Sequence, residues 1–335
     1  MRSPLVVVVI AVTVLAACDD SPTSPALPER RQAPAETNTL LVKSSWTVVR
    51  LPFKPRAIND AGVIVGTLAG EAVRYENGTM TILPHPAATP FDEQIAVAIS
   101  KMGKILGYSG ANALVWSEPT QAPLVVSPTV SGTMLDPLAI DDAGEFVAGS
   151  GDYAHVWRYA PGAGLRDITV QVGSYWSNDV NGMNAAGYAV GTASGTAGEY
   201  AVRWSANGTA TILPTFSSST VGEAINSHGD VLGWSVFGAT IWRADGSFAT
   251  IAELPNGTRI RGWNDAGRIA ANDQSRRPFT LFNGATTYLP LLDADYPLIR
   301  GVNSCGWIIG SGSGGTGFLW KHSGLTLCDG NRLAP

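Results

Sequence analysis

One short turn sequence recurs seven times along this chain, and that recurrence constrains the fold more than any other feature. The first copy reads AINDAGVIVGT, at residues 57–67. When the copies are aligned on the glycine that ends each turn, successive copies lie 38 to 43 residues apart. These glycines are Gly62, Gly103, Gly144, Gly187, Gly229, Gly267 and Gly306. A fixed period of this size along a chain indicates a repeat architecture.

Each repeat predicts four short strands. In the first copy the extended runs are RAI, GVIVGT, EAVRY and TMTILP, which are rich in β-branched or aromatic residues and too short for helices. The segment from Asn59 to Gly62 predicts a tight turn, because asparagine can bond its own backbone and glycine accepts a left-handed conformation. Asn77-Gly78 suits a two-residue hairpin. Each repeat is therefore predicted to be a four-stranded antiparallel meander.

Seven such sheets predict a ring. A sheet of about 41 residues cannot cover both of its faces, and radial stacking buries those faces while leaving only short edges. We therefore predict an all-β fold, a seven-bladed β-propeller. The alternative, an open solenoid, needs polar caps that we do not find. Residues 45–52 resemble a fourth strand yet precede the first repeat, so we expect them to pair into the seventh blade and close the ring.

An aromatic residue follows each turn glycine by thirteen to seventeen positions. We expect this row to lie on the third strand and to pack against the next blade, as core residues rather than as a sugar-stacking surface. The row comprises Tyr75, Trp116, Trp157, Trp204, Trp242, Phe282 and Trp320.

The repeat resembles a known family, the HAF extracellular repeat. That unit runs from a small residue through Ile-Asn-x-x-Gly-x-Val-Val-Gly to Ala-Phe-Leu-Trp. The closest matches here are Ala57–Gly66, Ala224–Gly233 and Gly317–Trp320, and the copies at 98–116 and 262–282 are degenerate. The resemblance covers about residues 45–328. It implies an exported or surface protein of β-repeat fold and implies no catalytic residues.

The first residues have the layout of an export signal, with Arg2 before an apolar run from Leu5 to Leu15. Leu15-Ala-Ala-Cys18 resembles the bacterial lipobox, which implies that residues 1–17 are a signal peptide and that Cys18 is acylated. The alternative is an ordinary signal peptide with an incidental cysteine. Residues 18–40, rich in Pro, Ser and Ala, predict a disordered tether. Residues 41–335 are then a single propeller domain.

Several acyl chains anchor a protein stably to a membrane. We therefore expect a protein of the bacterial cell envelope, lipid-anchored and extracytoplasmic, at the outer membrane or cell surface. Asp19 resembles an inner-membrane retention signal, so the inner membrane is the alternative location of the anchor. Cys305 and Cys328 are the remaining pair in an oxidising compartment, so we expect a disulfide between them, with two free thiols as the alternative.

The charged residues and histidines argue against several classes of protein. A formal net charge of −5 argues against a general nucleic-acid binder. We expect no metal and no cofactor, because the turns supply fewer oxygen side chains than a calcium loop needs. The four histidines occupy unlike positions in their repeats, so neither a metal site nor a catalytic triad can be read from them. We expect a monomer.

One position of the repeat suggests a binding site. The residue two before the turn isoleucine belongs to the innermost predicted strand, and it is Arg56, Arg261 and Arg300 in repeats one, six and seven. Ring closure would make these repeats consecutive. Grouped guanidinium groups can bind a carboxylate or sulfate in a bidentate manner. The alternative is that they pair with loop acids, among them Asp293 and Asp295.

Three further residues complete this candidate site. Glu223 and Asn181 occupy the same position in repeats five and four. Trp176, in the loop GSYWSND, is the tryptophan that we expect to be exposed and to contact a ligand.

The sequence favours a binding or scaffold module, with an anionic glycan or an envelope protein as its ligand. The first alternative is an envelope enzyme of the lyase or glycosidase type with its site at the channel mouth. The second is a structural spacer without a ligand. A propeller fold is compatible with all of these functions and does not discriminate among them.

Overall fold

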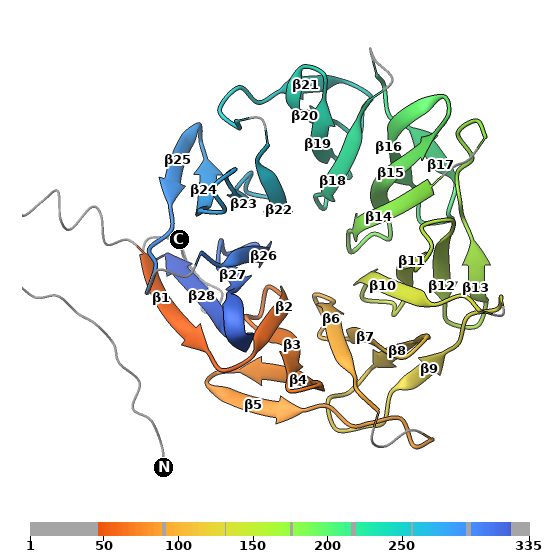
Figure 1. Ribbon diagram of the computed structural model, residues 1–335, viewed down its shortest axis with the longest axis vertical. Helices are drawn as coiled ribbons and strands as arrows, with labels where there is room; N and C mark the ends of the chain where they lie inside the picture. The colour runs from red at the N-terminus through yellow and green to blue at the C-terminus, as the bar shows by residue number, and fades with distance from the viewer. Residues whose placement is uncertain are drawn as a thin grey trace, which may run out of the picture. The chain divides into compact units, whose positions relative to one another are not determined.

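A computed structural model describes residues 46–322, except 89–91, 131, 175–176, 216–218, 256 and 293–295. Within these residues the chain forms strands, with one short 3-10 turn, η1, at Ser313–Gly315. The strands make seven four-stranded antiparallel sheets, which surround a common centre as the blades of a ring (Figure 1). The predicted seven-bladed propeller is confirmed, and the open solenoid is wrong.

The blades are numbered here along the chain, and their strands are given from the innermost outward. Blade 1 comprises β2 (Lys54–Ile58), β3 (Ile64–Leu68), β4 (Glu71–Glu76) and β5 (Thr79–Ile82). Blade 2 comprises β6 (Ile95–Ile99), β7 (Ile105–Ser109), β8 (Asn112–Trp116) and β9 (Leu124–Val126). Blade 3 comprises β10 (Leu135–Ile140), β11 (Phe146–Ser150), β12 (Val156–Ala160) and β13 (Gly164–Asp167). Blade 4 comprises β14 (Ser177–Met183), β15 (Ala189–Gly195), β16 (Gly198–Trp204) and β17 (Ala210–Ile212).

The last three blades follow the same plan. Blade 5 comprises β18 (Val221–Ile225), β19 (Val231–Ser235), β20 (Gly238–Trp242) and β21 (Phe248–Thr250). Blade 6 comprises β22 (Arg259–Trp263), β23 (Ile269–Asn272), β24 (Pro278–Phe282) and β25 (Ala285–Tyr288). Blade 7 comprises β26 (Leu298–Val302), β27 (Ile308–Ser311), β28 (Gly317–His322) and β1 (Trp46–Leu51).

Blade 7 closes the ring by joining strands from the two ends of the repeat region. The N-terminal strand β1 pairs antiparallel with β28, with Trp46 opposite His322 and Leu51 opposite Gly317. The rings of Trp46 and His322 meet edge to face, with their centroids 4.9 Å apart. The predicted closing strand is confirmed, and the structure makes it the outermost strand of the blade.

The hydrophobic core is divided into seven clusters, and each cluster lies between two neighbouring blades. Between blades 1 and 2, for example, Val65 and Leu83 pack with Ile105 and Trp116. A single blade therefore buries its faces only against its neighbours, which is why the stability of the fold requires the complete ring.

The tryptophans of the third strands pack against the preceding blade, whereas the sequence led us to expect the next one. The indole Nε1 of Trp116 donates to the carbonyl of Pro84 at 2.9 Å, and that of Trp242 donates to the carbonyl of Pro214 at 2.8 Å. Trp204 and Trp320 do the same. The strand pattern assigns these side chains to one face of the blade, but it carries no information about which neighbour that face meets.

The turn asparagines join neighbouring blades. The Nδ2 of Asn59 donates to the carbonyl of Ser100 at 3.3 Å. Asn184 and Asn264 make the equivalent bonds to the next turn at 2.9 Å. Asn303 donates to the carbonyl of Asn59 at 3.1 Å and so links blade 7 to blade 1. Each of these asparagines also accepts the amide four residues ahead through Oδ1. The side chain therefore shapes its own turn and ties it to the next.

Three turns lack this bond: blade 2 has Ser100 in place of the asparagine, the Nδ2 of Asn226 in blade 5 donates to Asp230 of its own turn, and the turn of blade 3 begins with Asp141. The carboxylate accepts the amide of Glu145 at 2.9 Å, but it has no N–H to donate to blade 4. The side chain is buried, and this burial raises the pKa of the Asp141 carboxyl, with a further contribution from the charge of Glu145. The buried carboxylate is therefore expected to destabilise the fold at neutral pH.

We predict that Asp141→Asn raises the free energy of unfolding at neutral pH by about 1 kcal/mol, because it removes a buried charge and supplies a donor. A raised carboxyl pKa means that the folded state holds the proton more tightly. The cost of the native carboxylate is thus present above the folded pKa and disappears below the unfolded one. The gain should therefore shrink as the pH falls through the raised folded pKa, and the part that comes from the charge should be gone below about 4. Denaturant titrations across this pH range measure it.

The control is Asp142→Asn, the neighbouring half-buried carboxylate, which accepts the Met102 amide at 2.7 Å. The asparagine keeps an acceptor there, so stability should change little. A loss of stability in Asp141→Asn at neutral pH would contradict the argument.

Candidate functional site

A β-bulge occurs at one equivalent position in every innermost strand. In each case the pairing with the second strand shifts by one residue. The residues at the shift are Arg56, Val97, Leu138, Asn181, Glu223, Arg261 and Arg300. A bulge changes the direction of a side chain and is common beside functional sites. The position singled out from the sequence is therefore the bulge position of each blade.

The bulge accounts for the second glycine, four residues after the turn glycine, in blades 1, 2, 4 and 5; alanine takes this position in blades 3 and 6. A Cβ on Gly191 would collide with the carbonyl oxygen of Asp179, and one on Gly66 with that of Lys54. Gly107 and Gly233 are placed in the same way. The innermost strand thus turns a carbonyl group over the second strand, and a glycine leaves room for it.

Side chains of the innermost strands alternate between the core and solvent. In β14, Val180 is only 2% exposed, whereas Asp179 and Asn181 on either side are exposed. In β22, Ile260 is also 2% exposed between the exposed Arg259 and Arg261. The same alternation holds in all seven strands. We call the bulge residues, together with the residues two positions before them, the inner surface of the ring.

Three arginines come together on this inner surface. The strands β22, β26 and β2, which carry Arg261, Arg300 and Arg56, are neighbours in the closed ring (Figure 1). Burial lowers the pKa of the Arg300 guanidinium, and the charges of Arg56 and Arg261 lower it further. The three cations are thus close enough to repel one another. We call them the basic arc.

The arginines of the basic arc form no ion pair within the part of the chain that the structure describes. The Nε of Arg300 donates to the Ser311 hydroxyl at 2.7 Å, but no described residue forms an ion pair with any of the three arginines. The loop acids Asp293 and Asp295 lie outside the described residues, so the predicted alternative pairing is not tested.

Two acidic residues of the inner surface were missed from the sequence. Asp136 in blade 3 and Asp179 in blade 4 occupy the position two residues before the bulge. Burial within the ring raises the pKa of both carboxyls; the charge of Arg56 lowers that of Asp136, and the charge of Asp179 raises it. Arg56 and Asp136 lie on β2 and β10, the innermost strands of blades 1 and 3. The sequence did carry a signal for the two missed residues: Asp136 and Asp179 are the acids found two residues before the bulge position in the seven repeats.

Glu223 in blade 5 completes an acidic group with these two residues. Burial raises the pKa of its carboxyl, and the charge of Arg261 lowers it. We call Asp136, Asp179 and Glu223 the acidic arc. Asn181 lies among them on the adjoining strand, where its Nδ2 donates to the carbonyl of Gly222 at 2.7 Å.

Other predicted site residues are not placed. Trp176, Cys18 and Cys328 lie outside the described residues. Cys305 lies in the turn that joins β26 and β27. Acylation of Cys18, the disulfide and ligand contact by Trp176 therefore stay predictions.

Histidines lie away from the basic arc. His85 bonds Glu71 at 2.7 Å and His155 bonds Asp167 at 2.7 Å, and neither histidine belongs to an innermost strand. Across the described ranges, no three histidine, cysteine or carboxylate side chains are grouped to hold a metal ion. The described residues also include no helix with the length and apolar character to span a bilayer.

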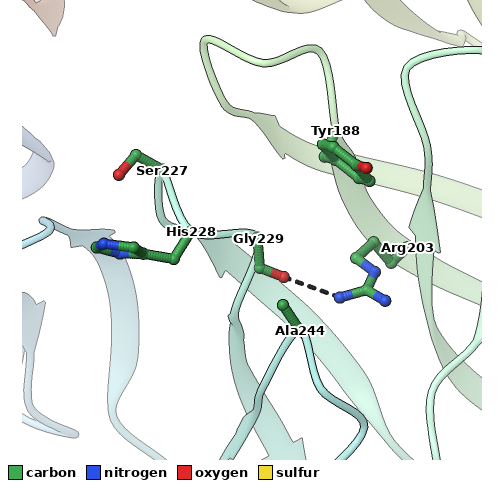
Figure 2. Close-up of a pocket in the computed structure, with 6 residues that line it drawn as sticks. All are labelled: Tyr188, Arg203, Ser227, His228, Gly229 and Ala244. Carbon is green, nitrogen blue, oxygen red and sulfur yellow. Dashed lines mark hydrogen bonds between the residues drawn. The ribbon is translucent and has the colours of Figure 1, made fainter.

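A small cavity of about 150 Å³ lies between the turns of blades 4 and 5 (Figure 2). Arg203 reaches across it, and its Nη1 donates to the carbonyl of Gly229 at 3.0 Å. The equivalent Arg158 of blade 3 also pairs with Glu145, but Tyr188 replaces this glutamate beside Arg203. In Figure 2 the side chains of Ser227 and His228 point away from Arg203. The polar groups therefore do not converge, and the inner surface is the better candidate site.

Comparison with known proteins supports the fold. No protein-family model and no curated protein matches the chain. A streptogramin B lyase structure aligns with a TM-score of 0.61 and 12% identity, covering 82% of this chain and 97% of that chain. Virginiamycin B lyase from Staphylococcus aureus aligns with a TM-score of 0.60 and 14% identity, over 82% and 99%. YCF48 bound to D1 peptide aligns with a TM-score of 0.57 and 13% identity, over 83% and 97%.

Identities this low show the fold alone. The protein is a seven-bladed β-propeller built from four-stranded repeats. Since no family model matches, membership of the HAF repeat family stays a prediction.

We predict that Arg300→Gln stabilises the fold, because it removes a half-buried cation that two neighbouring cations repel. The expected gain in the free energy of unfolding is about 0.2–1 kcal/mol at low ionic strength. It should decrease with added salt, which screens the repulsion. Thermal and denaturant unfolding at two salt concentrations measure the effect.

The matched control is Arg243→Gln, an exposed cation at the end of β20, whose stability should hardly change. If Arg300→Gln were less stable than the wild type at low salt, the three arginines would have to be compensated by other groups.

Proposed function

We propose that this protein is a binding module that recognises an anionic group through the basic arc on the inner surface of its propeller. The proposal rests on one observation: Arg261, Arg300 and Arg56 lie on neighbouring innermost strands, and none of them forms an ion pair with a described residue. Guanidinium groups bind carboxylate and sulfate oxygens in a bidentate manner.

The repulsion within the basic arc supports binding over a purely structural role. Charges with perturbed pKa values cluster at functional sites, where stability is sacrificed for activity. A spacer gains nothing from three neighbouring cations, because an uncharged side chain at these bulges would fold as well or better.

The solved propellers with similar structures include proteins of more than one function. Two are lyases, and another is described as bound to a peptide. The alternative that this chain is an envelope lyase or glycosidase rests on that shared fold alone. The binding proposal rests in addition on the arginines of this chain.

The proposed setting is the bacterial envelope. The lipobox-like sequence at Cys18 and the HAF-like repeats support a lipid-anchored, extracytoplasmic protein. In that setting the anionic group would belong to a glycan or to an envelope protein.

We expect the double variant Arg261→Gln/Arg300→Gln to fold but to bind anionic glycans at least tenfold more weakly. A charge-assisted hydrogen bond contributes about 1.5–3 kcal/mol, and the variant removes two such partners. An array of uronic and sulfated glycans, followed by calorimetry on the strongest ligand, gives the affinities.

The control Arg166→Gln/Arg243→Gln makes the same change in net charge on outer parts of blades 3 and 5, and it should bind as the wild type does. The proposal fails if the wild type binds no anionic ligand, or if both double variants lose affinity equally.

Acylation has its own test. In a bacterial host, Cys18→Ala should move the protein from the membrane fraction to the soluble fraction, because the anchor of acyl chains is lost. Mass spectrometry of the wild type should find the acyl groups on Cys18 and, before reduction, no alkylation of Cys305 or Cys328. An unmodified Cys18 would remove the anchor from the proposal, and two alkylated thiols would remove the disulfide.

A further inference from the structure

The inner surface of the ring carries charges of opposite sign on its two sides. Blades 6, 7 and 1 contribute only cations among its charged side chains: Arg259, Arg261, Arg300, Lys54 and Arg56. Blades 3, 4 and 5 contribute only acids: Asp136, Asp179 and Glu223. Blade 2 contributes the apolar Ile95 and Val97. The charges thus form two separate sectors.

Ring closure places these two sectors across the centre from each other. The innermost strands of consecutive blades are neighbours all the way round, including β26 and β2. Blade 2 separates the sectors on one side, and they adjoin only between blades 5 and 6 (Figure 1). The polarity is therefore a property of the whole ring and not of any one blade.

The two sectors interact through their charges, as Arg261 does with Glu223, but they form no close ion pairs with each other in the described part of the chain. No described residue forms an ion pair with a member of the acidic arc, just as none does with the basic arc. Asp136, Asp179 and Arg261 are solvent-exposed. Both sectors therefore keep their hydrogen-bonding and charge-pairing capacity for a ligand.

A ligand with charge of one sign complements only one sector of this surface, so it should bind more weakly than a ligand that carries both charges. A polyanion attracted to the basic arc would also approach the acidic arc, and like-charge proximity costs several kcal/mol in an interface. A polycation would meet the same difficulty on the other side. The surface selects a ligand that carries both charges, with the two charges some distance apart.

We propose that the ligand is an amphoteric polypeptide segment, whose acidic side chain binds the basic arc while a basic side chain faces the acidic arc. This inference rests on the proposed function and specifies its ligand. A polypeptide supplies both charges within a few residues, whereas an acidic glycan carries charge of one sign. Val97 and the exposed Leu138, 37% accessible, offer contacts for an apolar side chain between the charges.

The experiment is affinity selection from capped random octapeptides by the wild-type chain and two neutralised variants. The first variant is Asp136→Asn/Asp179→Asn/Glu223→Gln, and the second is Arg56→Gln/Arg261→Gln/Arg300→Gln. Peptides enriched by the wild type should contain both an acidic and a basic residue. In the first variant the enrichment of basic residues in the selected peptides should fall at least tenfold, while the enrichment of acidic residues should remain. The second should lose the preference for acidic residues.

A control with the same net charge as the first variant is Asp142→Asn/Asp152→Asn/Asp245→Asn, three acids outside the inner surface. It should enrich the same peptides as the wild type. Unfolding curves check that each variant folds, and if the triple acidic variant does not fold, the exposed Asp179→Asn alone should reduce the preference for basic residues.

The outcomes separate this inference from the proposed function. Enrichment of acidic peptides regardless of basic residues, or binding to anionic glycans alone, would overturn the inference and leave the proposed function standing. Enrichment of basic peptides alone would overturn both. Selection of no peptide, together with no binding to any anionic glycan, would likewise overturn both.

Discussion

The hydrogen bond from Asn303 to the carbonyl of Asn59 joins residues 244 positions apart, and with the pairing of β1 to β28 it closes the ring. Closure makes blades 7 and 1 neighbours. The two blades then bury a shared cluster that includes Leu51, Ile64 and Leu319. Without closure these faces would meet water, and Arg300 would not lie beside Arg56. The fold and the candidate site therefore depend on the same contact.

The bonds between turns also determine the geometry of the inner surface. Each turn asparagine lies three residues after a bulge, as Asn59 follows Arg56. Asparagine side chains tie the turns of blades 1 and 2, 4 and 5, 6 and 7, and 7 and 1, so the innermost strands leading into these turns, and their bulge residues, are held at a fixed spacing. A change in one of these asparagines would alter stability first, and it would also alter the distances between the charges that a ligand must match.

Features of this structure that are encoded within one repeat could be predicted from the sequence. Contacts between repeats could not. The period of the turns, the strand patterns and the surplus strand at residues 45–52 led to seven blades and a closed ring, because each of these signals is contained in one repeat or in a count of repeats. The packing of Trp116 against the preceding blade and the donation from one turn asparagine to the next depend on the spatial relation of two repeats. No single repeat encodes that relation. Asp136 and Asp179 were missed for a different reason: only the bulge position was compared among the repeats, and these acids lie two residues before it.

That last point explains where function can reside in a repeat protein. Turn glycines and third-strand aromatics recur in all seven blades, and turn asparagines in five of them, because they help a blade to fold and to pack against its neighbours. The bulge residue is less constrained, since its side chain lies at the edge of the core or outside it, and here it ranges from Val97, which still packs against a core cluster, through Glu223 to Arg300. Variation among the blades at this position is what allows one side of the ring to be basic and the other acidic. If the seven repeats were identical, the inner surface would have the same charge all round. The residues that differ among the repeats therefore determine the chemistry of the inner surface, and the residues that recur determine the fold that positions them.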